Sequence, residues 1–324
     1  MKAIVYHNYG SPDVLNLEEV QKPAPNADEV LIKVHAASVN AADWRLMRGE
    51  PFFVRLESGL LKPKNKILGA DIAGRVEAVG SHVTRFQPGD EVFGDLSESG
   101  WGGFAEYASV SEHVLALKSA SMSFEQAAAV PMAAVTALQA LRNKGQIQSG
   151  QKVLINGASG GVGTFAVQIA KSFGADVTGV CSTRKMEVVR SLGADHVIDY
   201  KQEDFTKNGE QYDLILAANG HHPIADYKRA LSPNGIYVCS GGSMTQIFQG
   251  MLLGPWMSMN GNQKMGSLLA KPNKDDLAFM RELIEAGKVV PVIDKRYPLS
   301  EVPSAIRYIE EGHAKGKVVI TVEH

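Results

Sequence analysis

A glycine-rich segment, Asn156–Gly163, constrains the fold of this chain more than any other feature. A strand-like apolar run at 152–156 precedes it, and a run with helical periodicity at 162–173 follows it. Glycine allows a tight turn and lets the backbone approach a pyrophosphate closely. The free N–H groups and the positive end of the helix dipole then attract the anion. The segment therefore predicts a dinucleotide-binding loop.

Gly160 and Gly163 take the second and third glycine positions of the dinucleotide fingerprint, whereas Ala158 replaces the first. Taken alone, such a loop also fits another Rossmann ligand, such as a methyl donor, or a structural turn. The alternation of strands and helices around it favours the dinucleotide.

Strand-like and helical runs alternate from Gln151 onward, which is typical of a parallel sheet built from βαβ units. Strands are predicted at 152–156, 176–181, 196–198, 213–217 and 236–239, and helices at 162–173, 185–192 and 227–231. The pattern weakens after Gly241. There we expect a strand at 267–270, a helix at 274–286, and strands at 289–293 and 318–322 that return to the N-terminal domain.

The first third of the chain is β-rich. Period-two alternation at 30–34 and short apolar runs at 72–79 and 91–93 are separated by Gly/Pro turns. This pattern predicts a compact, barrel-like β domain. It changes at Ser123, which is predicted to cap a helical run because Gln126 follows in the first turn.

The residues after the second predicted strand bear on the choice of dinucleotide. An NAD site usually has an acidic residue there for the ribose 2′-OH. Here the strand ends at Cys181 and is followed by Ser182, Thr183, Arg184 and Lys185. Two hydroxyls and two cations suit a 2′-phosphate, so we expect NADPH as the cofactor. The alternative is an exposed helix start with solvated Arg and Lys side chains.

Composition excludes several classes of protein. The 324 residues carry a net charge of −2, which provides no global attraction to nucleic acid or an acidic membrane. Two cysteines cannot form a disulfide framework or a four-cysteine metal lobe. The longest apolar stretch, 127–141, is too short and too interrupted to span a bilayer. Strand-like alternation begins at the first residues, so we expect no targeting segment and a cytoplasmic protein.

Several further motifs resemble the medium-chain dehydrogenase/reductase superfamily. They are Gly69–Val76, Pro88–Val92, Val130–Ala137 and the loop Ala158–Gly163. The stretch Ala37–Trp44 resembles its zinc-free, zeta-crystallin-like quinone oxidoreductase branch. Cys181–Arg184, Ser191–Asp195 and Gly312–Lys317 resemble the subgroup of the chloroplast-envelope quinone oxidoreductases. The resemblance implies an α/β fold with a GroES-like β-rich barrel domain, 1–117 and 288–324, and a doubly wound parallel-sheet Rossmann domain, 118–287.

The resemblance also implies a function and a site. Members of the branch use NADPH to reduce quinones and the C=C bond of α,β-unsaturated carbonyl compounds. The implied catalytic residue is Asn40, near the nicotinamide and the substrate carbonyl. The implied cofactor contacts are Ser159, Gly160, Gly161 and Val162 at the pyrophosphate; Ser182, Thr183, Arg184, Lys185 and Tyr200 at the 2′-phosphate; Thr136, Ser240 and Gly241 at the nicotinamide; and Arg45 and Lys317 in the cleft.

A zinc site is not expected. In the alcohol dehydrogenase branch a Cys and a His bind the catalytic metal, and the matching positions here are Asn40 and Ala70. The candidates for stabilising the enolate are the Asn40 side-chain amide and the ribose hydroxyl of the cofactor. We expect water to protonate the α-carbon, because no convincing buried acid is recognisable. Trp44, Phe52, Phe53 and Trp256 are candidates for an apolar pocket lining, and His313 is expected on the surface. The branch suggests a homodimer formed through 267–270.

Two alternative functions remain open. One is a zinc-independent alcohol or aldehyde reductase, which would reduce C=O rather than C=C. The other is a non-catalytic NADPH-binding protein that acts as a sensor or binds RNA. The net charge and the lack of a basic aromatic patch argue against RNA, and we expect no nucleic-acid partner.

Overall fold

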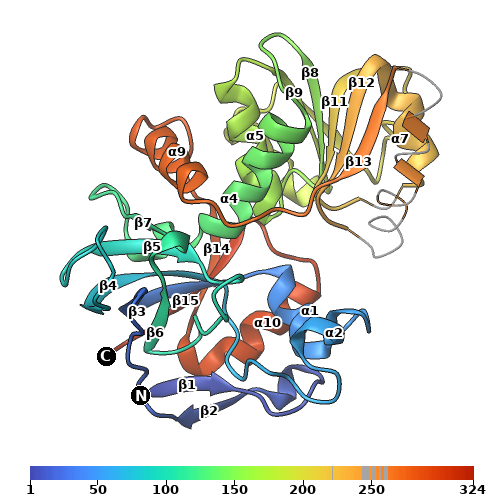
Figure 1. Ribbon diagram of the computed structural model, residues 1–324. Coiled ribbons are helices and arrows are strands. Elements are labelled where there is room, and N and C mark those ends of the chain that lie inside the picture. Colours follow the sequence, from blue (N-terminus) through green and yellow to red (C-terminus); the bar gives the residue numbers. More distant parts are fainter. Residues whose placement is uncertain (221, 243–248, 250, 252, 255–256, 259–261) are drawn as a thin grey trace. The chain divides into compact units, whose positions relative to one another are not determined.

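The computed structural model describes residues 1–324 except 221, 243–248, 250, 252, 255–256 and 259–261. Contacts divide the chain into two units. Unit 1 comprises Met1–Met132, Pro272–Glu285 and Pro291–His324, and unit 2 comprises Ala133–Lys271 and Ala286–Val290. Figure 1 shows the elements of each unit.

Unit 1 is built mainly of β-strands. Its strands are β1 (Lys2–Val5), β2 (Asn16–Glu19), β3 (Glu29–Val39), β4 (Asp71–Val79), β5 (Glu91–Asp95), β6 (Tyr107–Ser111), β7 (Leu115–Leu117), β14 (Ile293–Pro298) and β15 (Lys317–Thr321). Its helices are α1 (Ala41–Arg48), α2 (Val54–Ser58), α3 (Phe124–Ala128), α9 (Lys274–Glu285) and α10 (Val302–Glu310).

The long strand β3 organises the seven-stranded sheet of unit 1. Its order is β14-β15-β3-β4-β5-β7, and β6 also pairs with β3. β3 has antiparallel partners on both sides, with β4 on one and β15 and β6 sharing the other. Val30, Ile32 and Val34 alternate into the core with 0% exposure, which confirms the predicted period-two pattern. The last strands thus return to the N-terminal part of the chain, as expected.

The helical run that starts at Ser123 is interrupted at Pro131. Ser123 caps α3 by accepting from the Gln126 N–H, and the Gln126 side chain accepts from the Ser123 N–H. Pro131 then starts a second helix, α4 (Pro131–Leu138), where its missing N–H costs nothing. α3 packs on β3 and β4, and α9 contacts β7. Residues 118–132 and 272–285 therefore belong to unit 1, and the division lies after Met132.

Unit 2 contains a six-stranded parallel sheet in the order β10-β9-β8-β11-β12-β13. This is the strand order of a doubly wound dinucleotide-binding fold. The strands are β8 (Lys152–Asn156), β9 (Asp176–Cys181), β10 (His196–Asp199), β11 (Tyr212–Ala217), β12 (Leu231–Cys239) and β13 (Lys264–Ser267). In addition to α4, the helices include α5 (Gly161–Ser172), α6 (Met186–Ser191) and α7 (Ile224–Ala230). α5 lies along β8 and β9 (Figure 1).

Short helical turns complete both units. They are η1 (Pro12–Val14), η2 (Glu112–Val114), η3 (Gln139–Lys144), η4 (Thr183–Lys185) and η5 (Leu299–Glu301). In the part of the chain that the structure describes, we find no helix with the length and apolar character needed to cross a membrane.

Two predicted strands are wrong. The expected strand at 289–293 forms no strand over 289–292, where a side chain satisfies the backbone of Val290, and β14 begins only at Ile293. Gln168 accepts from the Val290 N–H at 2.8 Å and donates to the Val290 carbonyl at 3.0 Å. The expected strand at 267–270 begins where β13 ends. Ser267 pairs with Cys239, the last residue of β12. The Leu268 N–H still donates to the Cys239 carbonyl oxygen at 2.8 Å, but β12 offers no further residue and Leu269 is exposed.

Candidate functional site

The predicted dinucleotide loop requires glycine at two of its positions. Gly157 follows β8 with φ +89°, a conformation that a side chain disfavours. A Cβ atom at Gly163 would lie 2.1 Å from the Gly157 carbonyl oxygen, so the loop closes tightly against the first turn of α5. Gly160 has an extended backbone, and its nearest neighbour to an added Cβ atom is 3.5 Å away. The backbone at position 160 therefore does not itself require glycine. The absence of a side chain there leaves space in front of the loop.

The start of α5 leaves its amide groups available. Gly160 is the N-cap residue, so no side chain caps the helix, and its first turn contains no acidic residue. The N–H groups of the first helical residues have no partner within a helix. Ser159 precedes them and is 6% exposed. The loop thus presents several N–H donors and a positive helix end together, which is what a pyrophosphate requires.

The carboxyl ends of β11, β12 and β13 continue this site within unit 2. Gly241 follows β12, and a Cβ atom there would lie 2.4 Å from the Ala218 carbonyl oxygen. The hydroxyl oxygens of Ser240 and Ser267 are buried and have no hydrogen-bond partner among the described residues. A buried polar atom is normally paired, so these hydroxyls indicate a place for a polar ligand. Thr136 lies on α4 and is 8% exposed.

The segment after β9 contains an acidic neighbour that sequence analysis missed. Thr183 donates its hydroxyl hydrogen to Asp199 Oδ2 at 2.5 Å, and this bond lowers the pKa of Asp199. Asp199 ends β10 and pairs with Cys181 in the sheet. Arg184 and Tyr200 are exposed, whereas Ser182 and Lys185 are half-buried. Only the parallel pairing of two strands brings the carboxylate here, so spacing along the chain could not reveal it.

Unit 1 brings together Asn40, Asp71 and Lys317 in a buried polar cluster. The Lys317 ammonium donates to Asn40 Oδ1 at 2.5 Å and lies 3.3 Å from Asp71 Oδ2. The Asn40 amide donates to the same Asp71 oxygen at 2.9 Å. Asp71 also accepts from the Ser38 hydroxyl and from the Met132 N–H. The exposed fractions are 8% for Asn40, 2% for Lys317 and 0% for Asp71.

The strand register explains why these side chains meet. Val318 pairs with Val39, so Lys317 at the start of β15 lies next to Asn40 at the end of β3. Ser38 pairs with Asp71, and Asp71 pairs with Asp95 on the next strand. Three segments that are distant in sequence thus place their polar residues in one row across the sheet. Sequence analysis recognised Asn40 and Lys317 by resemblance but did not foresee their direct bond.

Two further carboxyl groups are buried close by. Burial raises the pKa of Asp43 to about 7, although its oxygens accept from the Asn40 and Gly69 N–H groups. Burial and the neighbouring Asp71 raise the pKa of Asp95 to about 6. Sequence analysis found no convincing buried acid, and the structure buries three carboxyl groups and an ammonium in this one region.

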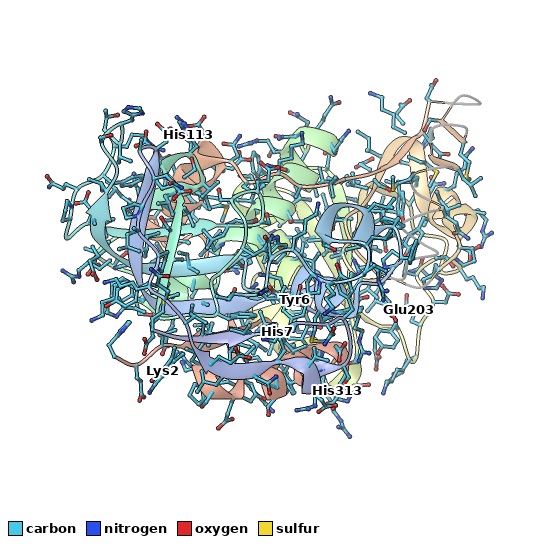
Figure 2. The ribbon with its side chains drawn as sticks, turned by 60° about the horizontal axis from the view of Figure 1, so that its bottom comes forward. Lys2, Tyr6, His7, His113, Glu203 and His313 are labelled. Atoms are coloured by element: carbon cyan, nitrogen blue, oxygen red, sulfur yellow. The ribbon has the colours of Figure 1, made fainter. Side chains whose placement is uncertain are left out.

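The other predicted residues have simpler surroundings. Arg45 is half-buried with its guanidinium carbon 5.3 Å from the centre of the Trp44 ring, and burial lowers its pKa. Phe52 and Phe53 are exposed, whereas Trp44 packs against the core of unit 1. Trp256 lies outside the described residues. His313 is exposed at the molecular surface, as expected (Figure 2).

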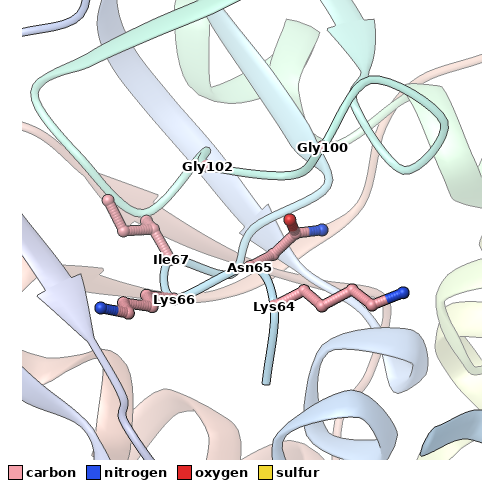
Figure 3. Close-up of a pocket in the computed structure, with 6 residues that line it drawn as sticks. All are labelled: Lys64, Asn65, Lys66, Ile67, Gly100 and Gly102. Atoms are coloured by element: carbon pink, nitrogen blue, oxygen red, sulfur yellow. The ribbon is translucent and has the colours of Figure 1, made fainter. Parts of the chain in front are cut away.

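A separate pocket of about 370 Å³ lies in unit 1 between two loops, Lys64–Ile67 and Gly100–Gly102 (Figure 3). The Lys64 and Lys66 side chains extend in opposite directions there, so their charges do not converge (Figure 3). The pocket contains none of the predicted site residues.

The residues at the metal positions of the alcohol dehydrogenase branch do not fit zinc. Zinc sites use Cys, His, Asp or Glu side chains. Asn40 offers an amide that is already bonded at both ends, and Ala70 has no donor atom. Over the residues with described placement, we find no group of three or more His, Cys, Asp or Glu side chains that could hold a metal ion.

The strand order and glycine loop of unit 2, combined with the β-rich unit 1, define a two-domain dinucleotide-dependent oxidoreductase. A family model described as "Alcohol dehydrogenase GroES-like domain" matches residues 26–120, and one described as "Zinc-binding dehydrogenase" matches residues 192–320. The chloroplast envelope quinone oxidoreductase homolog of Arabidopsis thaliana is 36% identical over 99% of this chain and 98% of its own length.

Two further proteins support the same assignment. The NADPH-dependent alkenal/one oxidoreductase of Arabidopsis thaliana is 36% identical over 99% of this chain and 79% of its own. The structure of the quinone oxidoreductase from Coxiella burnetii matches with a TM-score of 0.88 and 31% identity, over 100% of this chain and 99% of that one. The chain belongs to the quinone oxidoreductase branch of the medium-chain dehydrogenase/reductase superfamily, which confirms the resemblance and the predicted fold class.

Substitutions at two glycines should separate loop folding from ligand approach. Gly163→Ala places a Cβ atom 2.1 Å from a carbonyl oxygen, so we expect a fall in Tm of several degrees. Gly160→Ala meets no close neighbour, so Tm should stay within about 2 °C. The Kd for the dinucleotide should nevertheless rise about tenfold or more, because the methyl group keeps the pyrophosphate away. Thermal unfolding and fluorescence titration measure both effects. Unchanged binding by Gly160→Ala would contradict the assignment of the loop.

The raised pKa of Asp43 predicts a specific pH dependence of stability. Its folded-state pKa of about 7 exceeds its ordinary value of 3.8, so the folded state holds this proton more tightly than the unfolded state. The stabilisation is complete below about pH 4 and is lost as pH rises to about 7. We compare the free energy of unfolding of Asp43→Asn with that of the native protein at each pH. The value for the variant minus the value for the native protein should therefore increase by about 1 kcal/mol or more from pH 5 to pH 7.5. Urea titrations at both pH values test this, and Asp275→Asn is an exposed control.

Proposed function

We propose that this protein is an NADPH-dependent reductase that transfers hydride to quinones or to the C=C bond of α,β-unsaturated carbonyl compounds. One observation carries the proposal. Unit 2 has the strand order, the glycine contacts and the unpartnered Ser240 hydroxyl of a dinucleotide site, in a chain that resembles a named quinone oxidoreductase from end to end. The relative named as an alkenal/one oxidoreductase supports enones as a substrate class.

The residues of unit 2 suit a dinucleotide at three places. The N–H groups of Ser159, Gly161 and Val162 would hold the pyrophosphate. Gly160 would let it approach closely, because its own N–H already donates to the Gly157 carbonyl oxygen at 3.1 Å. Ser182, Arg184, Lys185 and Tyr200 would surround a 2′-phosphate, and Thr183 would present an oxygen whose hydrogen Asp199 already accepts. Thr136, Ser240 and Gly241 would border the nicotinamide. A bound nicotinamide supplies a hydride to an electron-poor carbon. Arg45 is a further proposed contact.

The role of Asn40 follows from where charge develops. When an enone accepts a hydride at its β-carbon, negative charge builds on the carbonyl oxygen, and a fixed hydrogen-bond donor there lowers the barrier. We assign that donor to the Asn40 amide. Asn40 and Ala70 are not zinc ligands, so the proposed reaction assigns no role to zinc. The Lys317 ammonium is only 2% exposed, so we assign protonation of the α-carbon to water.

Location and assembly stay predictions. We propose a cytoplasmic protein that forms a homodimer, and the edge strand β13 of unit 2 is the proposed contact. Unpaired backbone groups along an edge strand can pair with a second copy.

The proposed activity predicts a direct assay. Purified protein with NADPH and a short-chain quinone, or an α,β-unsaturated ketone, should consume NADPH at a rate that a chelator does not change. Product analysis should find the saturated ketone, since the hydride is expected at C=C rather than C=O. Asn40→Ala should lower kcat about tenfold to a thousandfold, because one donor to the developing charge is lost. Formation of the allylic alcohol would indicate a carbonyl reductase. Binding of NADPH without turnover of either compound would indicate a non-catalytic protein.

The cation of Arg184 in η4 predicts the coenzyme preference. Arg184→Ala should raise the KM for NADPH about tenfold to a hundredfold, because a charge-assisted bond to the 2′-phosphate contributes about 1.5–3 kcal/mol. The KM for NADH should stay within about twofold. Arg190→Ala, which removes an exposed cation at the end of α6, is the matched control and should change neither value. Equal effects on both coenzymes would contradict a 2′-phosphate at this place.

A further inference from the structure

The Asn40 amide is held between two groups of opposite hydrogen-bonding character. Its oxygen faces the Lys317 ammonium at 2.5 Å, and its nitrogen faces Asp71 Oδ2 at 2.9 Å. An ammonium can only donate, and an ionised carboxylate can only accept. A flipped amide would place its NH₂ group against the ammonium and its oxygen against the carboxylate. Only one orientation of this side chain is therefore compatible with its neighbours.

The backbone of Asn40 is fixed as well. Asp43 Oδ2 accepts from the Asn40 N–H at 2.7 Å, and the Asp43 N–H donates to the Asn40 carbonyl oxygen at 3.1 Å. Asp43 Oδ1 also accepts from the Gly69 N–H at 3.0 Å. Asn40 thus has restrained main-chain and side-chain atoms. Hydrogen bonds that hold a buried side chain in one orientation are typical of a functional group that must point at a ligand.

One amide hydrogen of Asn40 is left with a weak partner. The first hydrogen serves Asp71, and the second has only the Ser38 carbonyl oxygen at 3.4 Å. Asn40 is also the most exposed of the three side chains, at 8% against 2% for Lys317 and 0% for Asp71. A ligand would therefore meet Asn40 before either charged group. The Lys317 ammonium draws electron density toward Oδ1, and this polarisation strengthens the amide N–H groups as donors.

We propose that Lys317 and Asp71 are positioning residues for Asn40, which orient and polarise its amide so that it donates to the substrate oxygen that gains negative charge. The inference rests on the proposed function and goes beyond it, because it assigns the charged pair a role that acts through Asn40 alone. The role requires that charge develops in the transition state. Loss of the pair should therefore lower kcat while KM changes little.

A structural role is the competing explanation, and measuring stability and kcat on the same variant separates the two roles. Buried ion pairs often contribute little net stability, and neutral replacement of both partners is frequently tolerated. Removal of one partner leaves the other charge unpaired and is strongly destabilising. The informative variant is therefore the neutral double substitution Asp71→Asn/Lys317→Met, which removes both charges and frees the Asn40 amide to adopt either orientation.

The experiment compares this double variant with a matched control in the same unit. Lys118 is also a buried lysine, with a 4% exposed side chain, and it pairs with Glu91 at 2.9 Å. The control Glu91→Gln/Lys118→Met removes that pair without touching Asn40. Tm, the Kd for NADPH, and kcat and KM with a quinone are measured for the full-length protein and both variants.

On this inference Lys317 acts through Asn40, to which its ammonium is bonded, and not as the direct cofactor contact that the resemblance implied. Both double variants should therefore keep the NADPH Kd within about twofold, because the dinucleotide loop belongs to unit 2. The Asp71→Asn/Lys317→Met variant should lose about tenfold or more in kcat with KM within about threefold, whereas the control should retain kcat. A folded Asp71→Asn/Lys317→Met variant with kcat within twofold of the native value would overturn the inference.

A second variant keeps the test decisive if the Asp71→Asn/Lys317→Met variant does not fold. Asp71→Asn/Lys317→Gln removes both charges, so no buried charge is left unpaired, and it retains a neutral donor toward Asn40 Oδ1. Its kcat should fall about threefold to tenfold with KM unchanged. Native kcat in that variant would overturn the proposal equally. Failure of the native protein itself to oxidise NADPH with any quinone or enone would instead contradict the proposed function. The two failures are therefore distinguishable.

Discussion

The buried pair of Lys317 and Asp71 links the strand register of unit 1 to its candidate site. A charge that leaves water must be paired and hydrogen-bonded, or it destabilises the fold. Lys317 lies at the start of β15 and Asp71 at the start of β4, 246 positions apart in sequence. The pair forms only if β15 pairs with β3 in the observed register, because a slip by one residue would turn its side chains to the other face. The chain must therefore return to its first domain after unit 2 is complete.

Unit 2 depends on a different constraint, the close approach of backbone to backbone at the glycine loop. Gly157 and Gly163 bring the end of β8 against the first turn of α5 with no space for a side chain. The same approach exposes helix N–H groups at the carboxyl edge of the sheet, where the strand order changes direction between β8 and β11. The hydroxyls of Ser240 and Ser267, which have no hydrogen-bond partner in the part of the chain that the structure describes, lie at the ends of β12 and β13. The glycine loop and the groups available to a ligand therefore lie along the same edge of the sheet.

Much of the fold could be predicted because the patterns were local. β8 and β9 match their predicted bounds, and the cap at Ser123 forms as expected, since alternation, glycine turns and capping act over a few residues. The predicted strand at 289–293 failed because Gln168, far away in sequence, bonds the Val290 backbone. Apolar content alone cannot show whether the backbone N–H and C=O groups of a segment bond to a neighbouring strand or to a side chain.

The sequence by itself determined the class of fold, the glycine loop and the family, because each depends on residue types at short spacing. It also identified Asn40 and Lys317, but only as separate positions. Tertiary structure alone decided that Asp71 joins them, that Asp43 and Asp95 are buried with raised pKa values, and that Asp199 binds Thr183. The physical reason is the same in each instance. Strand pairing joins residues from distant segments, and burial then changes their charge equilibria, so neither effect can be read from neighbours in the chain.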